Sequence, residues 1–517
     1  MRNWLPPTIA LFTLAIRFSA GPWPIDDAYI TFRYARNAVN GLGLVYNPDQ
    51  SVLGTSTPAF ALLLALISGV TGADIPWAAL AVSALADAIT VLLICQLAQR
   101  LRLPSWSALM CSLTWALYPL GYRYAIGGME TSLASVLILS ALTLHLAGHE
   151  GRAALLAGFA VLTRPDALAA AFVILLAQAL RTSRLPWRSI LILTAVLFPW
   201  LIFATWQYGT PLPQSLQAKS HAVYLALSGE NALQILYQIG GLLLAGPMGL
   251  AAQGMNIYLP PERRALPLTA GVILSGLWGL GALQAIRADR RWAAFFAIPP
   301  LFAGTYALLG LRGNLMAEWY LVPLAPLFFL GIFGGTVSLC RRFGPPLYPS
   351  LAIAVCCVIL MSQVAGLNLG RLPGRSAIVP RIVWTEREEL YRKAAEFLKP
   401  RLRAGEVVAA SEIGALGYYC DCQILDTVGL ISPEALEYYP LPLSMYVVNY
   451  AVPPNLIREK TPTYVVSLDV FIRSSLLRET WFLRDYGLDW EAETRAFGSR
   501  RLLVFRRAPQ GEAGGGQ

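Results

Sequence analysis

The chain has 517 residues, of which 56% are hydrophobic and only 14% are charged, and its mean hydropathy is +0.53. Soluble globular domains carry about 25% charged residues, so this composition excludes an ordinary soluble enzyme, a disordered chain and a coiled coil. The formal net charge is +10, and it is unevenly placed. Residues 1–369 hold 21 Lys+Arg and 12 Asp+Glu, whereas residues 370–517 hold 19 and 18. We therefore expect a transmembrane domain at 1–369 and a soluble domain at 370–517.

Eleven apolar runs in the first domain approach the length of about 20 residues that a transmembrane helix needs. A further run at 58–71 is only 14 residues long, which suits an interfacial helix better than a span. The sequence thus predicts about 11 transmembrane helices. The runs lie at 4–20, 77–99, 105–122, 131–147, 153–163, 167–180, 189–208, 266–286, 292–310, 319–338 and 347–367.

The turns between these runs alternate in charge. With Arg2 in the cytoplasm, the turns on that side hold 12 basic residues, and Glu150 and Asp289 are their only acids. The opposite, outer side receives nine carboxylates, the long connections 21–76 and 209–265, and the soluble domain. Because cytoplasmic loops are enriched in Lys and Arg, we expect a multi-pass protein of the cell membrane. Its chemistry and its C-terminal domain should be extracytoplasmic.

The first outer loop carries an acidic pair, Asp26 and Asp27, directly after the first run. Tyr29, Arg33 and Arg36 follow at i, i+4 and i+7, so they share one face of a predicted helix. One interpretation is a helix cap with interfacial aromatics and snorkelling arginines. The other is a reaction site, because carboxylates near a membrane are costly without a function. One of them would act as general base, and the arginines would bind a phosphate.

Further polar and aromatic residues fall on the same predicted side of the membrane. Taken singly, each has a simpler interpretation as a helix cap, a solvated charge or part of an aromatic belt. Because all of them fall on one predicted side of the membrane, a common site is favoured. They are Glu130, Arg164, Asp166, Lys219, Arg312, Trp319 and Tyr320.

The soluble part mixes helical and strand patterns and predicts a small α/β domain. A helix is expected at 385–402 and strands at 406–411, 423–426, 464–468 and 501–505, followed by a flexible tail at 511–517. Residues 413–417 are Gly-spaced but lack GxGxxG, which argues against a dinucleotide site. Cys420 and Cys422 stand without a His or Cys cluster, which argues against a metal site.

Seven segments carry a resemblance to a known family. They are DDAYITFRYARNAVNGLGLVYNP (26–48), GGMETSL (127–133), LTRPDAL (162–168), YGTPLPQSLQAK (208–219), EWYLVPLAP (318–326), EIGALGYY (412–419) and LDTVGLISPE (425–434). The chain resembles the GT-C superfamily of polyprenyl-phosphate-sugar-dependent glycosyltransferases. Within it, the chain is most similar to the terminal arabinofuranosyltransferase branch.

The resemblance implies a mainly α, polytopic fold with a C-terminal α/β domain and two juxtamembrane helices in the first outer loop, here at 28–40 and 58–71. It implies inverting transfer of a sugar, arabinofuranose or mannose, in cell wall biogenesis. The donor would be a polyprenyl phosphate and the acceptor a glycan, lipid or protein. Asp26 or Asp27 would be the base, with Asp26 favoured. The donor phosphate would meet Arg33, Arg164, Lys219 or Arg312, and the acceptor Glu130, Tyr29, Trp319 and Tyr320.

Other interpretations stay open. A divalent metal is possible, because some members of the superfamily use one, but no ligand spacing identifies a metal site. A transporter or flippase for a lipid-linked glycan would need coupling charges inside the membrane, where Asp87 and Arg17 are the main candidates. A receptor with an outer sensor domain is a third possibility. Nucleic acid is excluded as a partner, because the arginines occur singly or in pairs between apolar runs.

Overall fold

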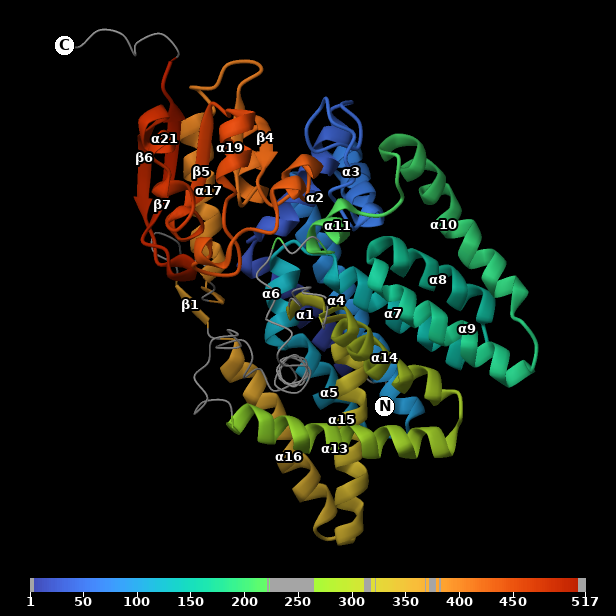
Figure 1. Ribbon diagram of the computed structural model, residues 1–517. Helices are drawn as coiled ribbons and strands as arrows, with labels where there is room; N and C mark the ends of the chain where they lie inside the picture. Colours follow the sequence, from blue (N-terminus) through green and yellow to red (C-terminus); the bar gives the residue numbers. More distant parts are fainter. Residues whose placement is uncertain are drawn as a thin grey trace, which may run out of the picture.

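The computed structural model describes residues 4–220, 223, 265–310, 318–320, 322–367, 369–371, 378–380 and 383–509. It consists of a helical bundle, formed by the chain up to residue 367, and an α/β domain that begins at α17 (Figure 1). The predicted fold class, a mainly helical membrane protein with a C-terminal α/β domain, is confirmed. The side of the bundle that carries this domain is called the domain side below.

The predicted apolar runs fall on helices, but the number of spans differs from eleven. In the described residues, six helices are long and apolar enough to cross a membrane. The bent pair α6–α7 raises this number to seven. Others are short: α1 has 16 residues and α8 has 14, or about 24 and 21 Å at 1.5 Å per residue, against a hydrocarbon core of about 30 Å. The bundle helices are α1 (Leu5–Ala20), α4 (Ile75–Arg100), α5 (Ser105–Ala116), α6 (Pro119–Ile126), α7 (Thr131–Leu146), α8 (Glu150–Thr163), α9 (Leu168–Thr182), α10 (Trp187–Tyr208), α13 (Ala265–Ala288), α14 (Trp292–Gly310), α15 (Ala325–Cys340) and α16 (Tyr348–Gly366).

One break in the bundle was not predicted from the sequence. The run 105–122 is divided into α5 and α6 because Pro119, at the first turn of α6, has no N–H to continue the preceding helix. The chain then bends by 120° between α6 and α7, at Gly127 and Gly128, in the interval that separates the predicted runs 105–122 and 131–147. Glu130 lies at this bend, between two helices.

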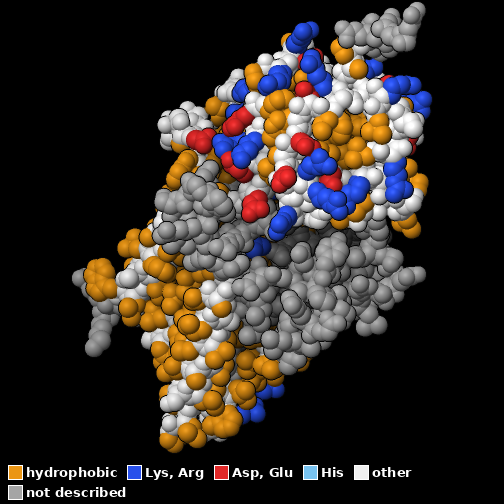
Figure 2. Space-filling view, turned by 90° about the vertical axis from the view of Figure 1, so that its left-hand side faces the viewer, with side chains coloured by type: hydrophobic (Ala, Val, Ile, Leu, Met, Phe, Trp, Pro, Cys, Tyr) orange, Lys and Arg blue, Asp and Glu red, His pale blue; other side chains and the backbone are white. Residues whose placement is uncertain are grey.

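The surface divides into a charged and an apolar part. Charged side chains gather over the C-terminal domain, and hydrophobic side chains cover the helices below it (Figure 2). On α10, the side chains of Trp187, Leu191 and Trp206 are at least 60% exposed, as expected where lipid replaces water. The turn between α15 and α16, which carries Arg341 and Arg342, lies at the end remote from the C-terminal domain (Figure 1).

The loop between α1 and α4 contains two helices, α2 (Asp26–Val39) and α3 (Pro58–Thr71). They match the expected juxtamembrane segments 28–40 and 58–71. On the same side of the bundle lie α11 (Gln214–Ser220) and the short 3-10 helices η1 (Pro165–Ala167), η5 (Glu318–Tyr320) and η6 (Val322–Leu324). These elements bring the connections of the bundle to the base of the C-terminal domain (Figure 1).

The C-terminal domain is a five-stranded mixed sheet of order β4-β3-β5-β7-β6. Strands β3 (Val407–Ala410), β4 (Gln423–Asp426) and β5 (Tyr464–Leu468) are parallel, and β7 (Arg501–Arg507) and β6 (Tyr486–Glu493) extend the sheet antiparallel. Four strands match the predicted ones. The sequence analysis missed β6, an edge strand whose mostly exposed residues lack an apolar pattern.

Helices pack around this sheet, and a small hairpin precedes it. The helices are α17 (Val383–Leu398), α18 (Gly414–Cys420), α19 (Pro454–Lys460), α20 (Asp469–Ile472) and α21 (Thr480–Asp485). The hairpin consists of β1 (Leu369–Arg371) and β2 (Ile378–Pro380).

Candidate active site at the junction of the two domains

Asp26 joins the first loop to the C-terminal domain. It opens α2, and only 5% of its surface is exposed. Its carboxylate oxygens accept hydrogen bonds from the backbone N–H groups of Gly414 and Ala415, at 3.0 and 3.1 Å. Its own N–H donates to the Glu388 carboxylate at 2.8 Å. Because the unpaired N–H groups that begin a helix attract negative charge, Asp26 acts as a cap for α18 across the domain boundary.

Two glycines allow α18 to approach α2 this closely. A Cβ atom at Gly414 would lie 1.9 Å from the backbone oxygen of Asp26, and one at Gly417 would lie 1.8 Å from the Tyr46 hydroxyl. Residues three apart share a helix face, so this Gly-x-x-Gly spacing forms a packing surface for the first loop. From the sequence, this spacing argued only against a dinucleotide site, and the packing of α18 on α2 was not predicted.

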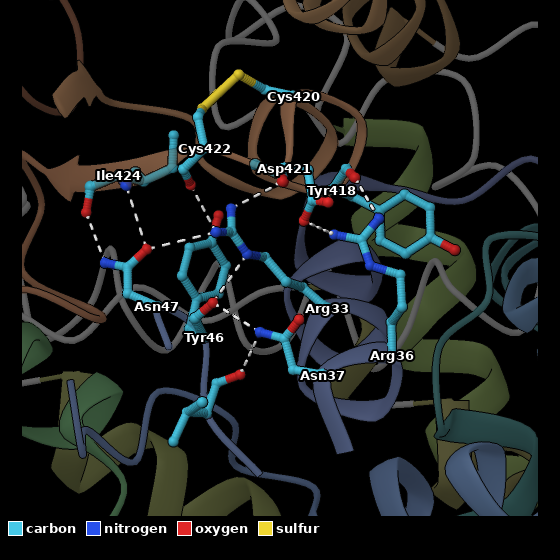
Figure 3. Close-up of polar contacts among 12 residues, drawn as sticks. Arg33, Arg36, Asn37, Tyr46, Asn47, Tyr418, Cys420, Asp421, Cys422 and Ile424 are labelled. Atoms are coloured by element: carbon cyan, nitrogen blue, oxygen red, sulfur yellow. Dashed lines mark hydrogen bonds and ion pairs between the residues drawn. A yellow bond between two sulfur atoms is a disulfide. The ribbon is translucent and has the colours of Figure 1, made fainter. Parts of the chain in front are cut away.

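Arg33 lies in the same interface and is 2% exposed. Its guanidinium donates to the backbone oxygens of Tyr46, Gly417 and Cys422 at 2.9, 2.7 and 2.6 Å, and lies over the Tyr46 ring at 4.2 Å (Figure 3). Arg36, one turn later on α2, donates to the Tyr418 backbone oxygen at 2.6 Å. A phosphate could reach Arg33 only by replacing these carbonyl partners, so the geometry favours a structural role over the predicted phosphate contact.

Asn47 connects the first loop to the edge of the sheet. Its amide nitrogen donates to the backbone oxygen of Ile424 at 2.9 Å, and its amide oxygen accepts from the Ile424 N–H at 3.2 Å. Since β4 is an edge strand, Asn47 satisfies backbone groups that would otherwise lack a partner strand. The contacts of Asp26, Arg33, Arg36, Tyr46 and Asn47 with the C-terminal domain are called the docking interface below.

Cys420 and Cys422 form a disulfide next to the docking interface (Figure 3). From the sequence these two cysteines were considered only as metal ligands, and the bond was not predicted. The bond encloses Asp421, whose carboxylate accepts a hydrogen bond from Arg36 at 2.9 Å. The disulfide therefore closes the turn that receives the two arginines of α2.

The GGMET segment meets the opposite face of the first loop. The N–H groups of Trp23 and Ile25 donate to the backbone oxygens of Ile126 and Gly127 at 2.8 and 3.1 Å. Gly128 has a φ of +72°, and a Cβ atom there would lie 2.6 Å from the Phe32 ring. A glycine is thus required both by the turn and by its contact with α2. The turn places Glu130 close to the acidic pair.

Arg164 joins three further segments at this point. It is 3% exposed, and its Nη1 donates to Glu130 at 2.8 Å while its Nη2 donates to Asp166 at 2.6 Å. Its guanidinium lies 5.2 Å from the centre of the Tyr320 ring, and Trp319 contacts both Tyr320 and Tyr124. The predicted residues Glu130, Arg164, Trp319 and Tyr320 are therefore gathered in one place.

Asp27 differs from its neighbour Asp26. Its side chain is exposed, and its charge acts on the carboxylates of both Glu130 and Glu412. It therefore lies between the membrane domain and the C-terminal domain, close to the Arg164 cluster. We call Asp27, Glu130, Arg164 and Asp166 the acidic cluster.

Arg387 holds a second group of carboxylates above Asp26. It contacts Glu388 at 2.6 Å and Glu412 at 3.0 Å. Burial raises the pKa of Glu388 to about 7 and that of Glu412 to about 8, and the charge of Asp26 adds to both shifts. One guanidinium faces the carboxyl groups of Glu388 and Glu412, so near neutral pH this pair retains a proton.

The other predicted site residues are placed differently or are not described. Tyr29 is 5% exposed, and its hydroxyl hydrogen-bonds that of Tyr419 at 2.9 Å. Lys219 lies on α11, but its side chain is not described, and Arg312 lies outside the described residues. Within the bundle, Arg17 and Asp87 form a buried ion pair at 3.0 Å between α1 and α4.

The described residues do not fit a metal ion. They contain no group of three or more His, Cys, Asp or Glu side chains arranged to hold one. The carboxylates of Glu130 and Asp166 are instead paired with Arg164.

Fold and site together define a class: an apolar helical bundle, a first loop with an acidic pair and juxtamembrane helices, and a C-terminal α/β domain. This is the GT-C fold. The chain is similar to ArnT from Cupriavidus metallidurans bound to undecaprenyl phosphate, with a TM-score of 0.55 and 13% identity over 98% of this chain and 99% of that one. The apo form of that ArnT gives a TM-score of 0.53 and 12% identity, with 97% of each chain covered.

A second solved structure is also similar in fold. The oligosaccharyltransferase of Archaeoglobus fulgidus, solved in complex with Zn and sulfate, gives a TM-score of 0.54 and 11% identity over 97% of this chain and 73% of that one. Residues 381–508 match a family described as Domain of unknown function (DUF8728). No curated protein sequence matches the chain. These comparisons establish the fold; the activity has to be argued from the site.

Proposed function

We propose that the protein is a glycosyltransferase that moves a sugar from a polyprenyl-phosphate donor to an acceptor hydroxyl group. The observation that supports this proposal is the acidic cluster: Asp27, an exposed carboxylate, acts electrostatically on Glu130, which shares Arg164 with Asp166 at the domain side of an apolar bundle. The similarity in fold to ArnT, which was solved with undecaprenyl phosphate, supports a polyprenyl-linked donor.

In the proposed reaction, Asp27 is the general base. It takes the proton of the acceptor hydroxyl as the oxygen attacks the anomeric carbon, and the bond from that carbon to the phosphate breaks with inversion. The phosphate leaves with the electron pair on its oxygen. Asp27 suits this role better than Asp26, because the oxygens of Asp26 already accept two backbone hydrogen bonds. Glu130, oriented by Arg164, positions the acceptor.

The departing phosphate needs positive charge. Arg164 supplies it beside Glu130 and Asp166, and Lys219 and Arg312 remain proposed phosphate ligands from the sequence. The aromatic rings of Trp319 and Tyr320, packed against Arg164 and Tyr124, provide a wall for the sugar or the first prenyl unit. Preorganised charges of this kind act where the transition state develops charge.

The donor sugar is proposed to be arabinofuranose or mannose, in cell wall biogenesis, on the basis of the resemblance to the terminal arabinofuranosyltransferase branch. The reaction is proposed to occur at the extracytoplasmic face of the cell membrane. The Cys420–Cys422 disulfide supports that side, because disulfides persist in oxidising compartments. The arginines of the turn at the remote end of α15 and α16 support it as well.

The experiment is transfer of labelled sugar by the purified protein from a panel of polyprenyl-phosphate sugars. Asp27→Asn should reduce the rate by roughly 10²–10⁴-fold, the range of general-base contributions, with the melting temperature unchanged. Asp49→Asn, an exposed aspartate of the same loop, is the matched control and should retain full activity. Wild-type rates in Asp27→Asn would exclude it as the base.

A transporter of lipid-linked glycans is the second candidate. Its expected coupling charges, Arg17 and Asp87, are buried and paired with each other, which is the arrangement of a structural ion pair between two helices. Translocation of a polyprenyl-linked glycan in proteoliposomes without formation of a glycoside would favour this function over transfer.

A further inference from the structure

A pocket of about 140 Å³ lies between the two domains and contains no residue of the acidic cluster. Its lower wall is formed by Pro22–Pro24, directly after α1, and by Asp74 and Pro76, at the start of α4. Its upper wall is the face of α17 that carries Glu388, Glu389 and Arg392. The pocket therefore opens where two apolar helices of the bundle meet the soluble domain.

Aromatic rings form a large part of this pocket. Trp23 comes from the lower wall, Tyr29 from α2 and Tyr419 from α18. The Tyr29 and Tyr419 rings lie 5.4 Å apart and their hydroxyls 2.9 Å apart, so two rings and two hydroxyl groups point to the same place. Aromatic surface with adjacent polar groups suits a ring that has both C–H faces and hydroxyls.

Carboxylates outnumber cations in the pocket wall, because Asp74, Glu388 and Glu389 stand against one guanidinium, that of Arg392. Arg392 binds both oxygens of Glu389 at 2.5 and 3.1 Å, and Glu388 binds Arg387 at 2.6 Å. A phosphate would face several carboxylates here, and a lipid tail would have to cover ion pairs, which is unfavourable. A neutral ligand rich in hydroxyl groups can donate to the carboxylates and accept from the guanidinium.

We infer that this pocket binds one sugar residue of a carbohydrate acceptor. The inference rests on the proposed glycosyl transfer and narrows its acceptor to a glycan. The volume is below the roughly 300–1,000 Å³ of drug-sized ligand sites, which suits a single ring. Glu388 lines the pocket and also accepts the Asp26 N–H, and Tyr29 lies two residues after Asp27. The bound ring is thus the neighbour of the acceptor ring whose hydroxyl attacks the donor.

The test removes the polar wall; Glu396, the second carboxylate paired with Arg392, is exposed to solvent, so its charge stays hydrated. In Glu389→Ala/Arg392→Ala both members of one ion pair are lost together, and Glu389→Gln is a milder second variant. Lys393→Ala is the matched control, because Lys393 is an exposed residue of the same helix that does not line the pocket. Acceptors are octyl mono- and disaccharides of arabinofuranose and of mannose, with octanol as the alcohol without a sugar. Saturation-transfer NMR measures disaccharide binding independently of catalysis.

The double variant should raise the KM for the preferred disaccharide roughly tenfold, a change of about 1.4 kcal/mol, with kcat and hydrolysis of the donor by water nearly unchanged. Lys393→Ala should match the wild type. An unchanged KM and unchanged disaccharide signal in both pocket variants would overturn the inference, as would equal transfer to octanol. Disaccharide binding that depends on Glu389 and Arg392, in a protein that transfers no sugar from any donor, would support the pocket and reject the proposed function.

Discussion

Two faces of the first loop carry similar residues and have different structures. The docking interface, toward the C-terminal domain, is buried and its polar groups are bound to backbone partners: the Asp26 carboxylate to two N–H groups and the Arg33 guanidinium to three carbonyls. The acidic cluster, toward the membrane domain, combines an exposed Asp27 with carboxylates that share one arginine. The adjacent aspartates thus have different roles. Asp26 holds the two domains together, whereas Asp27 is exposed to solvent.

This comparison predicts opposite results for the two aspartates. Asp27→Asn should lower transfer by roughly 10²–10⁴-fold without loss of stability. Asp26→Asn weakens two hydrogen bonds to a charged group, each worth about 1.5–3 kcal/mol, so it should lower the melting temperature while a folded fraction retains turnover. Parallel rate measurements and thermal melts separate the two effects. The reverse pattern, with the stable but inactive variant at Asp26, would exchange the assigned roles.

Close packing of α18 on α2 provides the next prediction. Gly414→Ala introduces a Cβ atom against the Asp26 backbone, and such overpacking costs about 1–3 kcal/mol. We expect earlier release of the C-terminal domain in limited proteolysis and reduced transfer, because Asp27 is displaced with α2. Gly487→Ala is the control, since a Cβ atom there meets nothing within 4 Å. Equal protease resistance of both variants would show that the docking interface is not under this constraint.

Much of the fold was predictable from local patterns, because apolar runs and strand alternation depend on neighbouring residues. The helix at 58–71 and the strands at 423–426 and 464–468 are confirmed with the same bounds. The docking interface was not predictable, because Asp26 and Gly414 are 388 residues apart and each looks like an ordinary cap or turn residue. Arg33 was assigned to a phosphate from its charge, its place in the first outer loop and the family resemblance. Only the three-dimensional contacts show that backbone carbonyls occupy its guanidinium.

The disulfide beside the docking interface provides a further prediction about the contact between the two domains. A bond that closes so short a loop stabilises by about 1–2 kcal/mol in the chain-entropy model. Cys420→Ser/Cys422→Ser should therefore lower the melting temperature by a few degrees. A dithiol reductant should lower the melting temperature of the wild type by the same amount and leave that of the double variant unchanged. Thermal melts of the wild type and the double variant, each with and without reductant, test this prediction. A reductant effect that persists in the double variant would assign it to another cysteine.

The smallest expected effect concerns pH. The pKa of Glu412 is raised to about 8 in the folded protein, from an ordinary value of 4.5. The folded state therefore binds more protons than the unfolded state between these values, so stability falls as pH rises from about 5 to 8 and is constant below about 4.5. Glu412→Gln resembles the protonated carboxyl and should reduce this dependence. Thermal melts from pH 5 to 9 measure it, and we expect the variant to melt about 2–4 °C above the wild type at pH 9. Parallel curves for both proteins would mean that Glu388, which shares Arg387 with Glu412, holds the titrating proton.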